Sequence, residues 1–378
     1  MVIRILLTGG GSGGHIYPLV AVAEELKIQA LQKGVVIDLK IFGDGELLRS
    51  VSAQVGIEYK GIMSPKWRRY MSFQNFIDIF KLPVGFFQSL FYVWRFMPDI
   101  IFSKGGYGSF LPSLAGRIFM IPLVIHESDA IPGKANLWLG KMSQKIFVSF
   151  DVVRKYFNVE KTELVGNPIR SGILKVVDRA SALTSFGLDH NEPTILVTGA
   201  TQGAQNINDA LISSIVELTK KFQVIHQCGQ KNYENVNNQI LAIVKEGEVT
   251  YGQAISKNYR LYSSFDLEQM ALAYSASDVV VSRAPAGSIF EIAALGKPAV
   301  IIPIKNSASN HQLANAREFS KFGAIVIEED NLTPHILINE IGKMYDNRVE
   351  ASQKIKGFAK PEAAQIIGEK LLEMIKPS

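Results

Sequence analysis

Several glycines and one histidine follow the first apolar run of the chain, a combination suited to binding phosphate. The stretch Thr8–His15 reads TGGGSGGH and comes directly after VIRILL. Three of its glycines have the G-x-G-x-x-G spacing of a dinucleotide-binding turn, in which backbone amides at a helix N-terminus face a phosphate. The acidic residue that would hold a ribose is expected about 20 positions after the last glycine, but the second apolar run ends later, at Asp44. The loop therefore predicts an anion site without predicting a dinucleotide, and His15 either packs against the loop or transfers protons there.

A second glycine cluster and a polar segment follow two later apolar runs. SKGGYGSF (Ser103–Phe110) comes after DIIF, and VIHESDAIPGKAN (Val124–Asn136) places polar residues at the end of another run. Two amide-rich loops in one half of the chain are difficult to explain as ordinary turns. His126 and Glu127 are either a buried pair that satisfies itself, which is the commoner outcome, or groups that take part in chemistry.

The passage Ser282–Ile304, SRAPAGSIFEIAALGKPAVIIPI, holds a carboxylate with two alternative roles. Ser288 and Glu291 have the S-x-x-E spacing of a capping box before a short helix. Glu291 could also accept hydrogen bonds from two ribose hydroxyls, and the two roles are compatible. Ser309 and Gln312 repeat the ambiguity, with S-x-x-Q spacing at the start of the next helix.

The elements expected to position these residues alternate between short β-branched runs and longer helical patterns, which is typical of parallel α/β domains. The segment Ile195–Ala204, ILVTGATQGA, repeats the strand and glycine loop of the N-terminus. We therefore predict two doubly wound domains, each with a ligand loop after its first strand, and a cleft between them as the default site. A linker is expected to start at Gly166-Asn167-Pro168. The predicted strands are Val2–Leu7, Val36–Phe42, Ile57–Gly61, Asp99–Phe102, Leu123–His126, Lys145–Phe150, Glu163–Val165, Thr194–Thr198, Gln223–Gln227, Leu261–Ser264, Val279–Ser282, Ala299–Pro303 and Ala324–Ile327.

The composition narrows the class of protein. The chain has 378 residues, 47% of them hydrophobic, which suits two folded domains and argues against disorder. Its single cysteine, Cys228, cannot form an internal disulfide, which favours a reducing compartment. The longest uncharged apolar stretch, Leu82–Trp94, is shorter than the about 20 residues that span a bilayer, and the N-terminal run is too short for a secretory signal. The net charge of +5 suits an anionic ligand, acidic lipid or nucleic acid without selecting one.

A set of short segments, through their order and spacing, gives the chain its resemblance to a known family. They are GGGSGGHIYP, GGYGS, HES with PGKAN, GNPIR, GATQGAQNIN, FEIAALGKP and NHQLANA. Together they resemble the MurG family, glycosyltransferase family 28, over essentially the whole chain. The resemblance implies an α/β protein of the GT-B fold, two doubly wound Rossmann-like domains facing a central cleft. It further implies an acceptor domain over 1–165, a donor domain over 166–358 and a C-terminal helix, 359–378, that packs back on the first domain.

The family's reaction is an inverting transfer of N-acetylglucosamine from UDP-N-acetylglucosamine in peptidoglycan synthesis. The acceptor is the C4 hydroxyl of N-acetylmuramic acid in undecaprenyl-pyrophosphoryl-N-acetylmuramoyl-pentapeptide (lipid I), and the product is lipid II. The resemblance therefore implies that the first glycine loop binds the pyrophosphate of the acceptor. The matching acceptor residues are Gly11, Ser12, Gly13, Gly14, His15, Gly105, Gly106 and Tyr107.

For the donor, the resemblance implies that Glu291 binds the ribose and that Thr201 faces the nucleotide phosphates. Arg170 would add positive charge, and Gln312 would contact the sugar. The complete set of donor residues is Arg170, Thr201, Gln202, Phe265, Asp266, Gly287, Ser288, Glu291, His311, Gln312 and Asp129, with Phe265 and Asp266 near the uracil.

Two departures from the family pattern fall within this expected site. Many members have His-Glu-Gln-Asn where this chain has His126-Glu127-Ser128-Asp129, so that a carboxylate replaces an amide near the sugar. Pro285 stands where members often carry glycine, and it removes a backbone amide. Direct displacement needs a base for the acceptor hydroxyl, for which His15 is the first candidate and Asp129 or Glu127 the next.

The departing UDP needs positive potential, which we expect from the helix N-terminus near Gly287, the amides around Thr201 and the charge of Arg170. No cofactor or metal is expected to be required, although a divalent cation could stimulate transfer. The lipid acceptor implies a peripheral protein on the cytoplasmic face of the bacterial plasma membrane, bound to anionic lipid and not to nucleic acid. Other cell-wall synthesis proteins are a further class of expected partner. The expected membrane-facing residues are Trp67, Arg68, Arg69, Phe76 and Phe80.

Other functions fit part of the pattern. A Rossmann oxidoreductase using the first glycine loop and Asp44 leaves the second glycine loop and the Glu291 region unexplained. A related GT-B enzyme acting on another lipid, or a UDP-N-acetylglucosamine 2-epimerase, would share the fold. A non-catalytic scaffold for cell-wall enzymes would fit the altered sugar contacts.

Overall fold

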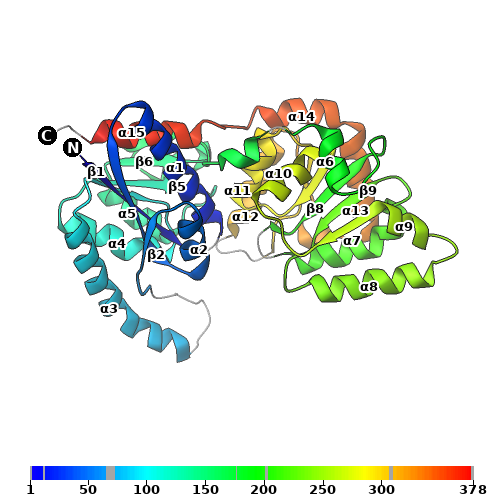
Figure 1. The fold of residues 1–378 in the computed structure, drawn as a ribbon, viewed down its shortest axis with the longest axis horizontal. Coiled ribbons are helices and arrows are strands. Elements are labelled where there is room, and N and C mark those ends of the chain that lie inside the picture. The colour runs from blue at the N-terminus through cyan, green and yellow to red at the C-terminus, as the bar shows by residue number, and fades with distance from the viewer. Residues whose placement is uncertain are drawn as a thin grey trace. The chain divides into compact units, whose positions relative to one another are not determined.

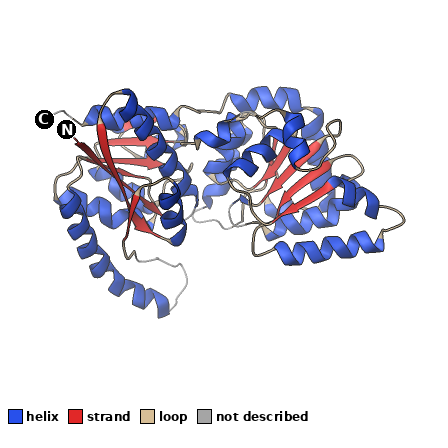
Figure 2. Cartoon of the chain, viewed as in Figure 1, coloured by secondary structure: helices blue, strands red, loops and turns tan. Residues whose placement is uncertain are grey.

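The chain folds into two compact units. The computed structural model describes residues 2–11, 13–64, 73–175, 177–200, 203–305 and 310–375. Unit 1 comprises Met1–Arg170 and Lys360–Ser378, and unit 2 comprises Ser171–Ala359. Strands and helices alternate along both units (Figure 1; Figure 2).

The described part of unit 1 is built on a sheet of seven parallel strands, in the order β3-β2-β1-β4-β5-β6-β7. The strands are β1 Val2–Gly10, β2 Val36–Asp44, β3 Glu58–Gly61, β4 Ile100–Ser103, β5 Leu123–Glu127, β6 Lys145–Val148 and β7 Thr162–Leu164. The helices are α1 Gly13–Gln32, α2 Glu46–Gln54, α3 Phe73–Phe96, α4 Tyr107–Ile118, α5 Lys134–Met142 and α15 Ala363–Met374, with short 3-10 helices η1 Asp151–Tyr156 and η2 Val159–Lys161.

Helix α15, from the end of the chain, packs on α1 near its beginning. The side-chain amide of Gln29 in α1 donates to the carbonyl of Gln365, 2.9 Å away. Gly368 faces the same glutamine, and a Cβ there would lie 3.0 Å from Gln29 Oε1. Ile367 and Leu371 of α15 are completely buried with the core residues of α1. The last helix is therefore part of the core of unit 1.

The described part of unit 2 has six parallel strands in the order β10-β9-β8-β11-β12-β13. The strands are β8 Thr194–Thr198, β9 Gln223–Gln227, β10 Tyr259–Tyr262, β11 Val279–Ser282, β12 Ala299–Ile301 and β13 Ile325–Val326. The helices are η3 Ser171–Leu174, α6 Arg179–Ser185, α7 Gln205–Leu218, α8 Tyr233–Glu246, α9 Gly252–Asn258, α10 Leu267–Ala276, α11 Ala286–Ala294, α12 His311–Ser320, η6 Glu329–Asn331, α13 Pro334–Asp346 and α14 Arg348–Lys356.

The predicted strands all occur, with their ends shifted by a few residues. Strand β10 is displaced at both ends, because it is expected at Leu261–Ser264 and found at Tyr259–Tyr262. The strand begins earlier because Tyr259 pairs with Val224 of β9 and its ring is buried beside His226. This long-range packing has no counterpart in the local sequence.

Both sheets are covered on two faces, which requires strands that are apolar along their whole length. Strands β4 and β5 are buried at every position. In α1, Leu19, Val22 and Leu26 recur at helical spacing and are fully buried in the core of unit 1. The alternation of apolar runs and amphipathic helices therefore produced the predicted layers.

Each sheet has one point at which the strand order reverses. The reversal falls between β1 and β4 in unit 1 and between β8 and β11 in unit 2. Loops leaving such a pair of strands turn to opposite faces of the sheet, and the crevice at the carboxyl ends of the strands is where α/β domains bind ligands. In unit 1 these loops are the two glycine-rich segments. In unit 2 they are the loop before α7 and the segment that leads into α11.

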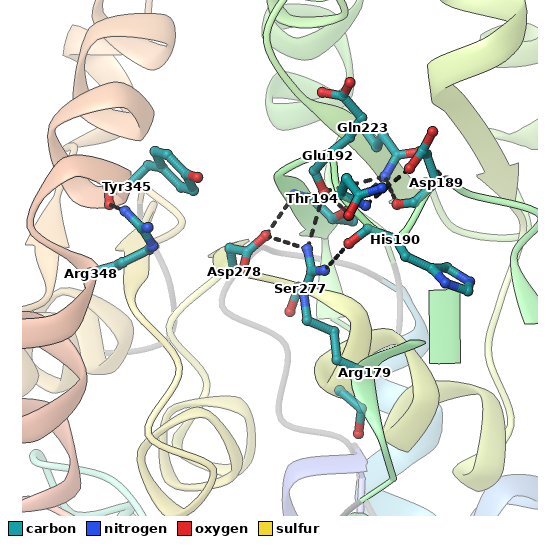
Figure 3. A network of polar contacts seen from close by, with 12 residues as sticks. Arg179, Asp189, His190, Glu192, Thr194, Gln223, Ser277, Asp278, Tyr345 and Arg348 are labelled. Atoms are coloured by element: carbon teal, nitrogen blue, oxygen red, sulfur yellow. Dashed lines mark hydrogen bonds and ion pairs between the residues drawn. The ribbon is translucent and has the colours of Figure 1, made fainter. Parts of the chain in front are cut away.

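A separate polar network connects the segments at the amino-terminal ends of the strands in the unit 2 sheet, and Figure 3 shows part of it. Asp278, before β11, accepts hydrogen bonds from Arg179 Nη2 at 2.9 Å and from the Thr194 amide at 2.8 Å. Lys297 Nζ donates to the Ser277 carbonyl at 2.9 Å, and burial lowers the pKa of Lys297 to about 8. These charged groups lie at the amino-terminal ends of the strands, opposite the crevice. Their role is to connect neighbouring strands and helices.

Candidate functional site

The two glycine loops of unit 1 lie directly against each other. A Cβ at Gly108 would come within 2.8 Å of the Gly9 carbonyl oxygen, and one at Gly106 would clash with the Gly10 carbonyl. Gly105 and Gly106 also have φ values of 84° and 82°, which disfavour other residues. The absence of side chains thus lets two main-chain segments meet at the strand reversal, where an anion can approach backbone amides.

His15 lies in the first turn of α1, which begins at Gly13. Its Nδ1 is 3.3 Å from the carbonyl oxygen of Lys104, the first residue after β4. A hydrogen on Nδ1 donated to that carbonyl makes Nε2 the nitrogen that accepts a proton. The ring of Tyr107 lies beside Gly11, where a Cβ would be 3.1 Å from it. The structure therefore brings together Gly11, Gly13, Gly14, His15, Gly105, Gly106 and Tyr107, while Ser12 is outside the described residues.

Glu127 is the last residue of β5, and both of its carboxylate oxygens accept hydrogen bonds from groups in unit 1. Oε1 accepts from the Asp129 amide at 3.0 Å, and Oε2 accepts from the Gly133 amide at 3.0 Å and from Asn136 Nδ2 at 2.9 Å. Burial and the nearby Asp129 carboxylate raise the pKa of Glu127. The carboxylate shapes the loop that connects β5 to α5.

The neighbours of Glu127 differ in their access to solvent. His126 is completely buried, with Nε2 2.8 Å from the Gly166 carbonyl, and burial holds its pKa well below the usual range. His126 is therefore a neutral core histidine. Asp129 is half-buried, so it is the carboxylate of this segment that reaches solvent.

Lys104 is a charged member of this region that the sequence did not point to. It is fully buried, and its Nζ donates to Ser128 Oγ and, at 3.3 Å, to Asn167 Oδ1. Burial lowers the pKa of Lys104 to about 7, and the nearby Glu127 and Asp129 carboxylates limit the decrease. The sequence could have indicated that Lys104 is buried, because it lies between an apolar strand and two glycines, where an exposed lysine is unexpected.

Arg170 belongs to unit 1 in the structure. Its guanidinium lies over the ring of Tyr17 in α1, 4.0 Å from the centroid, a favourable cation–π distance. Burial raises the pKa of Glu24 in the same helix, and the positive charge of Arg170 offsets only part of this increase. Arg170 thus lies on the first turns of α1, in the unit that carries His15.

In unit 2, the loop after β8 is held close to β9. Thr198 Oγ1 donates to Gln227 Oε1 at 2.5 Å and accepts from the Ala200 amide at 3.1 Å. A Cβ at Gly203 would lie 2.8 Å from the Gly229 Cα, so this glycine is required by a close approach of two loops. Thr201 and Gln202 lie outside the described residues.

Of the two roles considered for Glu291, the capping box does not occur in the structure. Helix α11 begins at Ala286 with Pro285 as its N-cap, which places Ser288 and Glu291 inside the helix. Glu291 Oε2 instead accepts a hydrogen bond from the hydroxyl of Tyr274, 3.2 Å away on α10. A Cβ added at Gly287 would meet open space, so the first turn of α11 is accessible. Glu291, Ser288 and Gly287 therefore all belong to this helix at the strand reversal.

The alternative role of Gln312, a capping box with Ser309, involves a residue outside the described part of the chain. The N-cap of α12 is Asn310, and Gln312 Oε1 accepts from the amides of Ala284 at 3.3 Å and Ile304 at 3.1 Å. Gln312 thereby fixes the loops that follow β11 and β12. Ser309 is outside the described residues, and His311 is the first residue of α12.

Asp266 forms a capping box that the sequence analysis missed. Its side chain accepts from the Gln269 amide at 2.8 Å, and the Gln269 side chain accepts from the Asp266 amide at 3.1 Å. Its neighbour Phe265 packs on Tyr262, with ring centroids 5.0 Å apart. The D-x-x-Q spacing was the signal that could have found this cap.

Arg283 was also not recognised as part of the site. At the end of β11 its Nη2 is 2.5 Å from Glu329 Oε1, and its Nη1 donates to the Ile302 carbonyl at 3.1 Å. Both side chains of the ion pair are less than a tenth exposed. The Lys305 amide donates to the other oxygen of Glu329 at 2.8 Å. The pair therefore holds three loops at the carboxyl ends of the strands.

The predicted membrane-facing residues lie in or before α3. Trp67, Arg68 and Arg69 are outside the described residues, and for Phe76 and Phe80 only their place in α3 is described. Further along α3, Phe87 and Trp94 are 67% and 60% exposed and share one helical face with exposed Phe91. Among the described residues, no helix is long and apolar enough to cross a membrane.

Comparison with known families accounts for both units. The model of the glycosyltransferase family 28 N-terminal domain matches residues 5–148, and that of the C-terminal domain matches residues 194–369. Together the two models cover most of the chain, and each contains one of the two strand reversals.

Individual relatives match the chain from end to end. A Treponema denticola protein is 36% identical over 97% of this chain and 94% of its own length, and one from Legionella pneumophila is 33% identical over 98% and 96%. Both are named UDP-N-acetylglucosamine--N-acetylmuramyl-(pentapeptide) pyrophosphoryl-undecaprenol N-acetylglucosamine transferase.

Solved structures share the fold at lower identity. Acinetobacter baumannii MurG matches with a TM-score of 0.72 and 23% identity, over 98% of this chain and 100% of that one. A Neisseria meningitidis UDP-GlcNAc 2-epimerase bound to UDP-GlcNAc matches with a TM-score of 0.67 and 14% identity, over 99% and 100%.

Proposed function

This chain belongs to glycosyltransferase family 28, with the two doubly wound domains of the GT-B fold, and from that premise we propose the reaction that it catalyses. It transfers N-acetylglucosamine from UDP-N-acetylglucosamine to the C4 hydroxyl of the N-acetylmuramoyl unit of lipid I. The product is lipid II, formed with inversion at the anomeric carbon. The relatives named for this activity match nearly the whole chain.

One observation about the structure carries the proposal. The described part of the chain has two strand reversals, each lined by a glycine-containing loop, and both substrates of this reaction contain a diphosphate. A dinucleotide oxidoreductase needs one such site, whereas a nucleotide sugar and a pyrophosphoryl lipid need two. We assign the lipid pyrophosphate to the glycine loops of unit 1 and UDP-N-acetylglucosamine to unit 2.

In unit 1, His15 is the proposed base for the acceptor hydroxyl. Its Nδ1 contact with the Lys104 carbonyl orients the ring, so that Nε2 can accept the proton during attack. Asp129 is the second candidate, because it is half-buried and is the carboxylate after β5 that reaches solvent. Glu127 shapes the loop through its three internal hydrogen bonds.

In unit 2, Glu291 is the proposed ribose ligand, and the first turn of α11 faces the phosphates. A helix N-terminus stabilises the negative charge that develops on the departing UDP. The accessible turn at Gly287 leaves room for a phosphate to approach. We propose that these groups stabilise UDP without an obligatory metal ion.

We further propose that unit 1 binds the cytoplasmic surface of the plasma membrane through α3. Exposed Phe87, Phe91 and Trp94 form an apolar stripe, while Gly85, Ser89 and Val93 form the buried side of the same helix. Arg95 adds an exposed positive charge beside the stripe. Such a combination suits an interfacial helix on anionic lipid.

The deciding experiment measures transfer of radiolabelled N-acetylglucosamine to lipid I in detergent, with wild type and Glu291→Ala in parallel. We expect label in lipid II from the wild type and at least a tenfold lower kcat/KM for the variant, because an ionic hydrogen bond contributes about 1.5–3 kcal/mol. A lipid-free control detects UDP release or 2-epimerisation. Epimerisation without transfer, or donor binding without either reaction, would overturn the proposal.

A further inference from the structure

Lys104 connects the two candidates for the catalytic base. Its carbonyl oxygen lies 3.3 Å from His15 Nδ1, and its side-chain ammonium binds Ser128, the residue between Glu127 and Asp129. The proposed function assigns it no role. It is nevertheless completely buried, which is rare for lysine unless the charge has partners.

The surroundings of the ammonium carry an excess of negative charge. Glu127 and Asp129, at and after the end of β5, both act on Lys104 electrostatically and raise its pKa. Two histidines lie on the surrounding elements: His126 in β5, which is buried and neutral and whose pKa the Lys104 charge helps to lower, and His15 in α1. Two carboxylates and one ammonium therefore share this part of unit 1.

The partners of Lys104 are arranged to suit a cation. Asn167 turns its side-chain oxygen toward the ammonium, and in the described part of the chain its buried Nδ2 has no hydrogen-bond partner. Asn167 therefore points its oxygen, and not its amide nitrogen, at Lys104 Nζ, although the buried nitrogen is left without a hydrogen bond. This orientation indicates that Lys104 Nζ carries a positive charge. Ser128 is a hydroxyl acceptor at the position where the family often has glutamine.

We propose that Lys104 is a positioning residue for the transfer reaction. Its ammonium fixes the Ser128–Asp129 segment. The same positive charge compensates the two carboxylates of Glu127 and Asp129, which lie close together in unit 1. This inference rests on the proposed function, because it concerns the base of that reaction. It also explains how the chain accepts a carboxylate at Asp129, where related chains often have an amide.

The proposal predicts a specific change in pH dependence. Whether His15 or Asp129 is the base, loss of a nearby positive charge favours the protonated, inactive form. In Lys104→Met the acidic limb of the kcat/KM profile should therefore move to higher pH by about one unit, the lower end of the range for loss of a neighbouring opposite charge. A merely structural role would lower activity equally at every pH.

Lys297→Met is the matched control. Lys297 is also a lysine with a pKa lowered by burial, but it binds the Ser277 carbonyl at the opposite end of the unit 2 sheet. Its substitution removes a comparable ammonium and should leave the position of the acidic limb unchanged. Profiles of kcat/KM for lipid I are measured from about pH 4 to 9 for both variants with saturating UDP-N-acetylglucosamine, so that the window includes the usual range of a carboxyl as well as that of an imidazole.

Thermal unfolding keeps the proposal testable if Lys104→Met is too unstable to assay. We compare Lys104→Met, Asp129→Asn and the double variant, each as the full chain. The double variant should be more stable than the sum of the single effects predicts, because it removes one carboxylate together with its counter-charge. Strictly additive effects would overturn the proposal, and so would a Lys104→Met profile that coincides with wild type. Absence of transfer by the wild type would instead refute the proposed function.

Discussion

Tyr274→Phe removes one hydroxyl from the proposed donor site and leaves the packing of its ring. Tyr274 is completely buried on α10, and its hydroxyl donates to Glu291 Oε2 at 3.2 Å. If Glu291 binds the ribose, this hydrogen bond helps to hold the carboxylate in the orientation that the two ribose hydroxyls require. The substitution should therefore weaken donor binding more than it weakens folding.

The expected size follows from the geometry. A hydrogen bond to a charged group contributes about 1.5–3 kcal/mol, and the length of 3.2 Å favours the lower end of that range. A loss of about 1.4 kcal/mol corresponds to a tenfold change in an equilibrium constant. We therefore expect the Kd for UDP and the KM for UDP-N-acetylglucosamine to rise about tenfold, with the KM for lipid I unchanged.

Isothermal titration calorimetry with UDP measures the change directly, and Tyr259→Phe is its control. Tyr259 is also buried in unit 2, and its hydroxyl lies 2.7 Å from His226 Nδ1. Loss of that contact should lower the melting temperature and leave UDP affinity within about twofold of wild type. Equal UDP affinity in Tyr274→Phe and wild type, or equal losses in both variants, would refute the role given to Tyr274.

Three further predictions concern the base, the membrane and the metal. His15→Ala or Asp129→Asn should lower kcat by about 10²–10⁴ at saturating substrates, as loss of a general base does; near-normal turnover in both would remove the assignment. Trp94→Glu, and charge reversal at Arg68 and Arg69, should reduce co-sedimentation with anionic vesicles, and unchanged binding would argue against this surface. Chelation by EDTA should leave the rate of transfer within about twofold, whereas a complete loss restored by Mg²⁺ would contradict metal-independent stabilisation of UDP.

The sequence predicted strands and glycine loops well because both depend on local features. An apolar run covered on two faces must be hydrophobic throughout, and the close approach at Gly106 excludes any side chain. The capping boxes show where local spacing is insufficient. The D-x-x-Q pattern at Asp266 forms one, whereas the S-x-x-E pattern at Ser288 does not, because Pro285 starts the helix earlier.

The missed residues depend on contacts that are distant along the chain. Lys104 binds groups 24 and 63 residues away, and Arg283 is paired with a carboxylate 46 residues away. A lysine or arginine is usually exposed, so the residue type alone suggests solvent. The order of the strands determines which loops meet, and only that order brings these partners together.

The return of α15 to unit 1 makes unit 2 an insertion within an otherwise complete domain. Unit 2 is a continuous stretch of chain, while unit 1 is assembled from two stretches. At the junction, a Cβ on Gly166 would lie 2.5 Å from the Cβ of Lys360, so the two stretches of unit 1 come close together there. The stretch of gene that encodes unit 2 can therefore be excised as one fragment, and unit 1 can be closed with a short peptide. The fold is thus open to exchange of unit 2 between relatives without redesign of unit 1.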